Sequence, residues 1–485
     1  MSPSTITHVD KERARRGKAT TTAALYMALD CEHLHASSSR HALTAVDEVV
    51  IGRTDRRTVN RTIERGARRL ALGIPNRWLS STHLALTRVL GRWLLEDARS
   101  KNGTFVNGVR VSRAELADGD IIEAGHVFFI FRASVPVPEE ESIDVDASDS
   151  TAPHLGMTTL VPRLAESFSQ LTRIAPSDVS VIVHGESGTG KELAARALHH
   201  LSGQPGPFIA VNCGALPASL VESELFGHKK GAFSGATEVR PGLVRAAHRG
   251  TLFLDEIGDL PAVAQPAFLR VLQEHEVTPV GGTQPVRVDV RVVCATHRDL
   301  DALVGAGKFR ADLLARLGGF RLELLPLRSR REEIGMIVAD LLARMQPEPA
   351  RHMRLTLEAG RALMHYDWPL NVRELEKSLG AARALAGDGD VEAEHLPAPV
   401  LRALAGHEQA SLGPKSSKTA ALALKRARRE RSLTATEEQH RDELFAQLSE
   451  HAGNISAVAR ALGKARIQIQ RWVKRYGLDP ESFRA

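Results

Sequence analysis

The chain has 485 residues, of which 43% are hydrophobic, and its formal net charge is +6. A chain of this length corresponds to roughly three domains. It contains no apolar run of about 18 residues that could span a membrane, and its polar, Arg-rich start lacks the apolar segment of a secretory signal. Its three cysteines, Cys31, Cys213 and Cys294, show no metal or redox spacing. We therefore expect a cytoplasmic protein without membrane contact.

Residues 22–133 are predicted to form an all-β domain. Short segments of alternating apolar and polar residues are separated by turns rich in Gly, Asn and Asp. The clearest predicted strands are Ala24–Asp30, Glu48–Ile51, Leu84–Thr87, Trp93–Glu96 and Val127–Phe131.

Three motifs of this domain resemble the forkhead-associated (FHA) domain, a β-sandwich that binds phosphothreonine. They are Gly52-Arg53, Ser80-Ser81-Thr82-His83 and Asn102-Gly103-Thr104-Phe105. The resemblance implies that Arg53 pairs with the phosphate and that Ser80 and Asn102 hydrogen-bond the phosphate and the peptide. His83 is expected to brace the loops.

Two features depart from the FHA pattern. Ser81 stands where the family often has Arg, and the segment between Arg53 and Ser80 is long. That segment carries Arg56, Arg57, Arg61, Arg65, Arg68 and Arg69. The alternative is a degenerate domain that only docks on the ATPase domain of its own chain.

Residues 134–153 are expected to form an acidic linker. They contain no basic residue and the acids Glu139, Glu140, Glu141, Asp144, Asp146 and Asp149. Residues 154–330 then follow as an α/β ATPase core, and residues 331–403 as its helical lid.

A phosphate-binding loop opens the ATPase core. The β-branched run Val179–Val183 predicts a strand, and the loop follows it directly. Its residues are Gly185, Glu186, Ser187, Gly188, Thr189, Gly190, Lys191 and Glu192. Glycines let backbone N–H groups converge on phosphates, Lys191 reaches the β/γ oxygens, and the following helix adds its positive end. Glu192 stands where a hydroxyl usually binds Mg²⁺.

A second motif predicts metal and water chemistry. The apolar strand Gly250–Leu254 ends in Asp255 and Glu256. Beside a triphosphate, Asp255 can hold Mg²⁺ and Glu256 can polarise the attacking water. Two solvated acids at a strand end are the alternative, and the spacing from the phosphate-binding loop favours ATP hydrolysis.

Further motifs resemble the AAA+ activators of sigma-54 RNA polymerase, the NtrC-like bacterial enhancer-binding proteins. The first pair is Glu224–His228 and Gly231–Ala236. The others are Asn212-Cys213, Ala295–Leu300, Phe309–Leu317 and Trp368–Leu375. Departures from the family pattern are Ser234 in place of Thr, His297 in place of Asn and Leu370 in place of Gly.

This resemblance implies that one loop contacts sigma-54 when ATP is bound. Its residues are Gly231, Ala232, Phe233, Ser234, Gly235 and Ala236. One aromatic residue among small ones suits a mobile loop with an apolar tip. The alternative is a hairpin whose Phe233 packs into its own domain.

The resemblance also assigns roles around the nucleotide. Arg310 and Arg316, both placed in a predicted helix, would reach the γ-phosphate of a neighbouring subunit, which implies a homo-oligomeric ring, expected as a hexamer. Two ordinary surface arginines are the alternative. Thr296 would be the sensor-one group and Arg373 the sensor-two cation on the lid. Asn212 would hold Glu256 back until the γ-phosphate is sensed.

The chain ends in a predicted basic linker, residues 404–432, and a DNA-binding domain, residues 433–485. Residues 401–485 carry 16 Lys and Arg against 9 Asp and Glu. Asn454 can cap a helix Ile455–Leu462, Gly463 supplies a turn, and a second helix runs to about Tyr476. This pattern resembles the Fis-type helix-turn-helix, and the alternative is a basic helical hairpin that packs on an acidic partner. The predicted base contacts are Arg466 and Gln468, and the predicted phosphate contacts are Arg471, Lys474 and Arg475.

The sequence thus predicts a multidomain protein: an all-β FHA sandwich, an α/β AAA+ P-loop ATPase with a helical lid, and an all-α helix-turn-helix. The implied function is a sigma-54-dependent transcriptional activator that uses ATP and Mg²⁺ and binds double-stranded enhancer DNA and sigma-54 RNA polymerase. The FHA resemblance implies a phosphothreonine protein or a Ser/Thr kinase as a further partner. The alternatives are a DNA-binding regulator with a weak or non-activating ATPase that acts without sigma-54, and a general AAA+ unfoldase.

Overall fold

The computed structural model describes residues 20–35, 38–64, 66–137, 143–147, 156–217, 219–233, 236–345, 353–387 and 389–411, together with residues 444, 447–451, 454–463 and 469. By its internal contacts the chain divides into two units, Met1–Ser411 and Leu412–Ala485, which are described separately. Among the helices in these ranges, none combines the length and the apolar character that a bilayer crossing requires.

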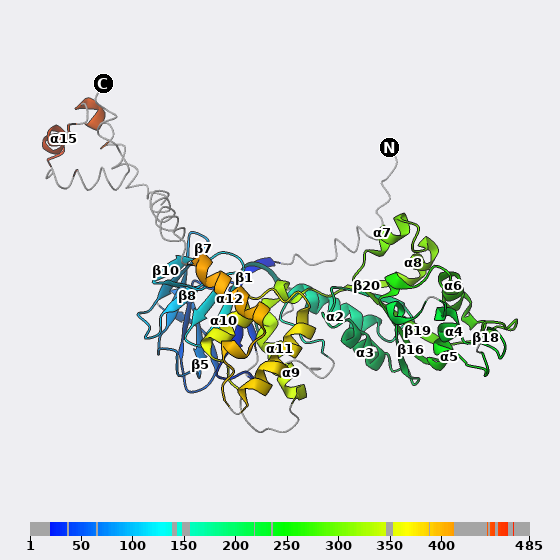
Figure 1. The fold of residues 1–485 in the computed structure, drawn as a ribbon. Coiled ribbons are helices and arrows are strands. Elements are labelled where there is room, and N and C mark those ends of the chain that lie inside the picture. The colour runs from blue at the N-terminus through cyan, green and yellow to red at the C-terminus, as the bar shows by residue number, and fades with distance from the viewer. Residues whose placement is uncertain are drawn as a thin grey trace, which may run out of the picture. The chain divides into compact units, whose positions relative to one another are not determined.

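The N-terminal part of the first unit is a sandwich of two β-sheets (Figure 1). One sheet has the strand order β13-β2-β1-β12-β11-β8-β9, and the other β10-β7-β6-β3-β5-β4. The strands are β1 Thr20–Asp30, β2 Ser39–Ala42, β3 Glu48–Arg53, β4 Thr58–Glu64, β5 Ala67–Ile74, β6 Leu84–Val89, β7 Arg92–Asp97, β8 Thr104–Val106, β9 Val109–Val111, β10 Arg113–Glu115, β11 Ile121–Ala124, β12 Val127–Val137 and β13 Asp144–Asp146. Alternate side chains of the central strands face the core between the sheets, where Leu25, Ile51, Leu86 and Phe129 meet. The predicted sandwich and its five clearest strands are confirmed.

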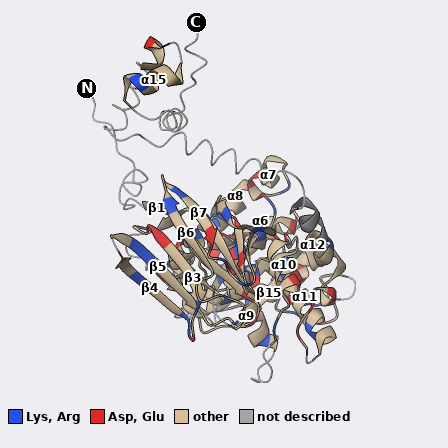
Figure 2. Ribbon diagram, turned by 90° about the vertical axis from the view of Figure 1, so that its left-hand side faces the viewer, with Lys and Arg blue, Asp and Glu red and all other residues tan. Residues whose placement is uncertain are grey.

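The arginine-rich segment after Arg53 forms an edge hairpin of β4 and β5 (Figure 2). Arg61 of β4 donates to Asp144 with an Nε to Oδ2 distance of 2.7 Å, and Arg57 lies 3.3 Å from Asp146. Both acids belong to β13, which pairs antiparallel with β2. The prediction of a linker over residues 134–153 is therefore wrong for this stretch. β12 continues to Val137, and Asp144–Asp146 joins the sandwich because arginines of the hairpin pair with its carboxylates.

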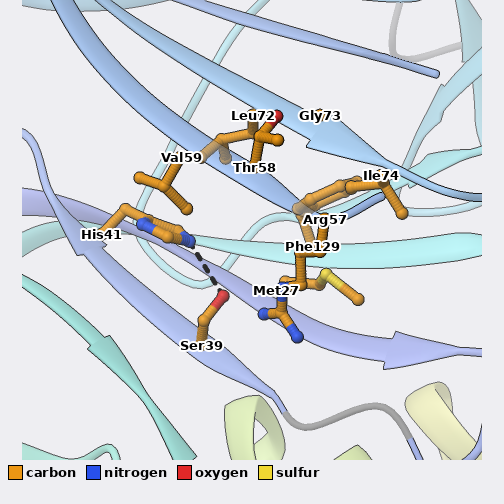
Figure 3. A pocket seen from close by; sticks show the side chains of 10 residues that line it. All are labelled: Met27, Ser39, His41, Arg57, Thr58, Val59, Leu72, Gly73, Ile74 and Phe129. Atoms are coloured by element: carbon orange, nitrogen blue, oxygen red, sulfur yellow. Dashed lines mark hydrogen bonds between the residues drawn. The ribbon is translucent and has the colours of Figure 1, made fainter. Parts of the chain in front are cut away.

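A small pocket lies beneath this hairpin (Figure 3). It is lined by Met27, Ser39, His41, Arg57, Thr58, Val59, Leu72, Gly73, Ile74 and Phe129. Ser39 and His41 form a hydrogen bond of 2.8 Å at its polar side. None of the residues predicted to bind nucleotide or phosphothreonine lines the pocket, so it belongs to the packing of the hairpin on the sandwich.

The ATPase core is a parallel sheet with the order β15-β16-β19-β14-β20 and helices around it (Figure 1). Its strands are β14 Val181–His184, β15 Phe208–Asn212, β16 Gly250–Asp255, β19 Val290–Thr296 and β20 Phe320–Glu323. Its helices are α2 Pro162–Ile174, α3 Lys191–Ser202, α4 Val221–Phe226, α5 Leu243–Ala246, α6 Gln265–Glu274, α7 Leu300–Gly305 and α8 Ala311–Leu317, and a small hairpin joins β17 Glu276–Val277 to β18 Val286–Arg287. Helices on both faces demand strands that are apolar throughout, as the buried run Leu252–Leu254 is. The carboxyl ends of β14, β16 and β19 meet at one edge of the sheet, which is where ligands bind in such folds.

The lid consists of the helices α9 Ile334–Met345, α10 Leu357–His365, α11 Asn371–Ala386 and α12 Ala398–Ser411. Two short 3-10 segments, η5 Leu327–Ser329 and η6 Arg331–Glu333, lead into it from the core. Thr356 caps α10 by accepting a hydrogen bond from the Ala359 N–H at 3.3 Å. The helical lid is as predicted, but its last helix runs to Ser411, so the predicted linker 404–432 begins inside a helix.

The lid and the FHA sandwich share one hydrophobic cluster. Tyr26 and Phe128, from β1 and β12, pack with Ile334 and Leu363 of the lid helices. The core between the sheets buries the other face of the same strands, as Phe129 illustrates. These strands are therefore buried on both faces. Docking of the FHA domain on its own ATPase, which the sequence offers only as an alternative, is a feature of this fold.

The second unit contains the helix α15 Ile455–Ala461. The Asn454 side chain caps it by accepting hydrogen bonds from the N–H groups of Ser456 and Ala457, as predicted. Val458 packs in a small cluster with Leu444, Leu448 and Ile469. The predicted second helix and the predicted DNA contacts Arg466, Gln468, Arg471, Lys474 and Arg475 lie outside the described residues.

Candidate functional site

The phosphate-binding loop connects β14 to α3 as predicted. Gly188 and Gly190 have φ angles of +78° and +103°, which residues with a side chain rarely adopt. Lys191 begins α3, and its Nζ donates to the carbonyl oxygens of Gly185 at 2.9 Å and Glu186 at 3.2 Å. The loop is thus closed around a buried ammonium group at the positive end of a helix, an arrangement suited to phosphates.

The carboxylates at the end of β16 lie beside this loop. Lys191 Nζ is 3.7 Å from Glu256 Oε1, which joins the two predicted motifs in one site. Burial, followed by the neighbouring Glu256, raises the pKa of Asp255 above its ordinary value. A divalent cation would favour the ionised form of Asp255, since it offsets both effects.

The oxygen donors of this site fit Mg²⁺, which proteins often hold through one or two carboxylates and substrate phosphates. Asp255 supplies such a carboxylate. Glu192 at the start of α3 is an oxygen donor too, but it is paired with Arg196 at 2.6 Å. In the described ranges no group of three His, Cys, Asp or Glu residues could hold a metal without such phosphates.

Glu256 has a partner that differs from the expected one. Its Oε2 lies 2.8 Å from His297 Nδ1. The Asn212 side chain accepts hydrogen bonds from the N–H groups of Gly214 and Ala215 and caps the 3-10 turn η3 Cys213–Ala215. No hydrogen bond among the described residues joins Asn212 to Glu256, so the predicted restraint by Asn212 stays a prediction. His297, noted in the sequence only as a departure, is the residue that contacts Glu256.

The end of β19 places Thr296 at the base of the loop, where its carbonyl accepts from the Gly185 N–H at 3.2 Å. Thr296 is fully buried, and its hydroxyl accepts from the Arg298 N–H at 3.0 Å. This position agrees with a sensor next to the phosphates, while the sensing itself stays a prediction.

The lid contacts the loop directly. Arg373 Nη1 donates to Ser187 Oγ at 2.9 Å, so the predicted sensor-two cation lies at the loop. The buried Asn371 donates to Glu186 Oε2 at 3.1 Å and to the Ser187 carbonyl at 3.0 Å. The motif Trp368–Leu375 contains Asn371, but nothing in its spacing singles this residue out.

Two arginines between core and lid also touch the loop, and no sequence motif indicates them. Arg328 pairs with Glu186 and holds the pKa of that carboxyl at about 2. Arg330 donates to the Thr189 carbonyl at 3.1 Å. The loop is therefore held by its own strand, by the segment before the lid and by α11.

Arg310 precedes α8 and Arg316 lies in its last turn, and neither touches the loop of its own chain in the described residues. Arg310 precedes the helix and pairs with Asp312 at 2.7 Å, so the prediction that both arginines lie within a helix is wrong for Arg310. Arg316 is exposed in the last turn. An exposed guanidinium can reach a neighbouring molecule, and that role stays a prediction.

The predicted sigma-54 loop is described at Gly231, Ala232, Phe233 and Ala236, whereas Ser234 and Gly235 lie outside the described residues. The Gly231 N–H donates to the Ala236 carbonyl at 2.8 Å and closes the loop. Phe233 is 37% exposed, and its ring lies edge-on to His228 at 5.0 Å. The aromatic tip therefore rests on its own domain but keeps a face open to a partner.

Arg53 and Ser80 lie side by side in the FHA loops, where the Arg53 N–H donates to the Ser80 carbonyl at 2.8 Å. The buried His83 ties them: its Nδ1 accepts from the Ser80 N–H at 3.2 Å, and its Nε2 lies 3.1 Å from the Gly103 carbonyl. These two hydrogen bonds agree with the predicted brace, and burial lowers the pKa of His83, which favours its neutral form. Asn102 donates to the Trp78 carbonyl at 2.7 Å. The Arg53 side chain is exposed.

Comparisons with known proteins agree with this architecture. Family profiles match residues 157–323 as a sigma-54 interaction domain, residues 328–412 as an AAA+ ATPase lid domain and residues 49–125 as an FHA domain. The regulatory protein AtoC of Escherichia coli (strain K12) is 39% identical over 321 residues, which are 66% of this chain and 67% of AtoC. The transcriptional regulatory protein ZraR of the same organism is 45% identical over 258 residues, 53% of this chain and 58% of ZraR.

Among solved structures, NtrX from Brucella abortus in complex with ATP is 31% identical over 65% of this chain and 68% of that chain, with a TM-score of 0.44. A structure described as showing phosphothreonine-dependent FHA domain interactions is 26% identical over 23% of this chain and 95% of that chain, with a TM-score of 0.17.

The response regulator PilR of Pseudomonas aeruginosa, 48% identical, is covered over only 53% of its length. The chain thus spans between half and two thirds of these curated relatives.

Proposed function

Because the chain belongs to the sigma-54-dependent transcriptional activators and carries their AAA+ ATPase domain, we propose that it hydrolyses ATP to remodel the closed complex of sigma-54 RNA polymerase. The observation that carries the proposal is the contact of Lys191 with Glu256 at the phosphate-binding loop, which the lid residue Arg373 also contacts through Ser187. Since the proposed partners, RNA polymerase and enhancer DNA, are cytoplasmic, the proposal includes a cytoplasmic location.

The described residues divide the chemistry among themselves. The glycine loop and the start of α3 bind the phosphates, and Lys191 compensates their charge. Asp255 would hold Mg²⁺, which supplies Lewis-acid polarisation of the phosphoryl oxygens when bound. Glu256 orients the attacking water and accepts its proton once it turns away from His297. Arg373 adds positive charge from the lid.

Output and control lie in the other parts. The loop with Phe233 contacts sigma-54, and the second unit binds enhancer DNA. Arg53, Ser80 and Asn102 bind a phosphothreonine segment of a partner or of a Ser/Thr kinase. Arginines that cross between subunits require a ring, expected as a hexamer.

A purified system tests the proposal. The protein, sigma-54 RNA polymerase and a sigma-54 promoter with its upstream site should give open complexes with ATP and Mg²⁺ but none with a non-hydrolysable ATP analogue. Open complexes with the analogue would contradict energy coupling. Absence of open complexes under every condition, with ATP still bound, would favour the regulator that acts without sigma-54.

His297 is expected to restrain the basal ATPase. Replacing His297 by Ala removes the hydrogen bond to Glu256, worth about 1 kcal/mol at this half-exposed position, so basal ATP turnover should rise roughly fivefold. His297→Asn should restore the restraint, because an amide can donate to the carboxylate. Steady-state phosphate release decides this, and a large fall in turnover for His297→Ala would mean that the histidine assists the reaction.

Arg53 is expected to carry the affinity for phosphothreonine. Arg53→Ala should weaken binding of a phosphothreonine peptide pool by at least about tenfold, since a charge-assisted hydrogen bond contributes about 1.5 to 3 kcal/mol. The control is Arg56→Ala, which removes a nearby exposed arginine. Calorimetry with phosphorylated and unphosphorylated peptides measures the effect. Equal affinity of the wild-type protein for both peptide forms would rule out phosphothreonine sensing.

A further inference from the structure

Two ion pairs join the FHA sandwich to the lid region. Arg132 of β12 lies 3.0 Å from Glu332, whose side chain is 5% exposed. Arg361 of α10 binds Glu123 of β11 through two hydrogen bonds of 2.7 Å, and the Glu123 side chain is 4% exposed. Carboxylates this deeply buried need their partners, because a buried charge without an opposite charge or hydrogen bonds is strongly destabilising. The FHA sheet is therefore matched in charge to this lid.

Glycines allow the two parts to come close. A methyl group added at Gly335 of α9 would collide with the Ala28 carbonyl oxygen of β1, and one added at Gly360 of α10 would collide with Cys31 and Phe128. Backbone and side chains of the sandwich occupy the space that a larger residue would need. The two surfaces are therefore complementary in shape at these positions.

The residues between core and lid link this contact to the nucleotide loop. Arg330, which donates to the Thr189 carbonyl, also lies 3.4 Å from the fully buried Glu333. Glu333 accepts from the Leu160 N–H at 2.7 Å, and the Leu160 carbonyl accepts from Arg40 of β2 at 3.3 Å. A continuous series of hydrogen bonds thus runs from the FHA domain to the phosphate-binding loop.

The phosphothreonine loops lie close to the same contact. Phe105 follows Asn102 by three residues, and the Arg361 guanidinium lies 5.0 Å from the centre of its ring. Arg361 therefore touches the strand after the Asn102 loop and, through Glu123, the sheet that packs on the lid.

We propose that the FHA domain is a clamp on the segment Arg328–Glu333 and on α10, and that this clamp sets the affinity of the phosphate-binding loop for nucleotide. The proposal rests on the proposed nucleotide function and adds its regulation. With the clamp engaged, Arg330, Asn371 and Arg373 are held against the loop before nucleotide arrives. Preorganisation of this kind lowers the free energy cost of binding. A phosphothreonine segment that changes the clamp would then change nucleotide affinity, and by reciprocity nucleotide would change the affinity for that segment by the same factor.

The test uses the full-length protein. Glu123→Gln with Glu332→Gln removes both ion pairs without cavities, and the partly exposed arginines can turn to water. Gly360→Leu is a second, independent variant that places a wedge between α10 and the sandwich while favouring the helix. The control is Arg92→Ala, which breaks an exposed pair with Glu115 elsewhere on the sandwich. The measurements are amide hydrogen exchange in β12 and α10, and the Kd of a fluorescent ADP analogue.

In both variants the backbone amides of β12 and α10 should exchange faster than in the wild type. The Kd for the ADP analogue should rise about tenfold, within the usual range of coupling between sites. The control should match the wild type in both measurements. Faster exchange with an unchanged Kd would overturn the coupling. Unchanged exchange in both variants would overturn the docking itself. A wild-type protein that binds no ADP analogue would contradict the proposed function, and hydrogen exchange would then decide the docking separately.

Discussion

Replacing Arg316 by Ala is expected to lower ATP turnover by about 10³-fold or more while ATP binding persists, the range found when an arginine finger is lost. Arg316 is exposed at the end of α8 and contacts no part of the phosphate-binding loop in the described residues of its own chain. A role of this guanidinium in catalysis would therefore require a nucleotide held by a neighbouring subunit. The control is Arg321→Ala, which removes an exposed arginine of β20 paired with Asp301 at 3.0 Å.

Mixing two inactive variants separates action between subunits from action within one. Glu256→Ala lacks the water-orienting carboxylate and keeps Arg316, whereas Arg316→Ala has the opposite defect. Rings that contain both variants create interfaces where an intact Glu256 faces an intact Arg316. Turnover of mixed rings, verified by tagged pull-down, should exceed the sum of the separate variants. Additive activity at every mixing ratio would withdraw Arg316 from catalysis between subunits.

Replacing Phe233 by Ala is expected to abolish open-complex formation and leave most of the ATP hydrolysis. The aromatic ring contacts His228 and keeps an exposed face, and no described contact joins it to the phosphate-binding loop. Its loss should remove the proposed apolar contact with sigma-54 without disturbing Lys191, Asp255 or Glu256. Promoter melting and phosphate release are measured on the same preparation.

The control for this change is Val239→Ala, which removes an exposed apolar side chain shortly after the same loop. It should leave promoter melting intact. Melting that survives Phe233→Ala would reassign the loop, and loss of both activities would show that Phe233 supports the fold of the core.

The sequence predicts the parts of this protein that depend on local pattern. A β-branched strand followed by glycines and Lys191 is typical of a phosphate-binding loop, and β14 overlaps the predicted strand Val179–Val183 while α3 follows the loop as expected. The alternation of apolar and polar residues predicts the strands of the sandwich. The FHA loops are predicted by short motifs, each of which lies within a single loop. Family profiles confirm these domains.

Contacts between distant residues are what the sequence does not predict. The sequence names Asn212 as the partner of Glu256 and His297 only as a departure from the family pattern, and only the fold reveals that His297 contacts Glu256. Arg328 and Arg330 belong to no motif, because their partners are backbone and side-chain atoms about 140 residues away. The acidic composition around β13 is typical of a linker, so the sequence does not predict a strand there. The arginines that pair with its aspartates are distant in the sequence.

The strand β13 also affects how the chain behaves at high concentration. A sheet edge with unpaired N–H and C=O groups can recruit strands of other molecules and start aggregation. Here β13 covers the edge of β2, and its two aspartates are paired with arginines. The opposite sheet ends in β4, an edge strand that carries the charged residues Arg61 and Glu64. Strand pairing between molecules is therefore disfavoured at both of these edges, at one by the ion pairs of β13 and at the other by charged side chains of β4.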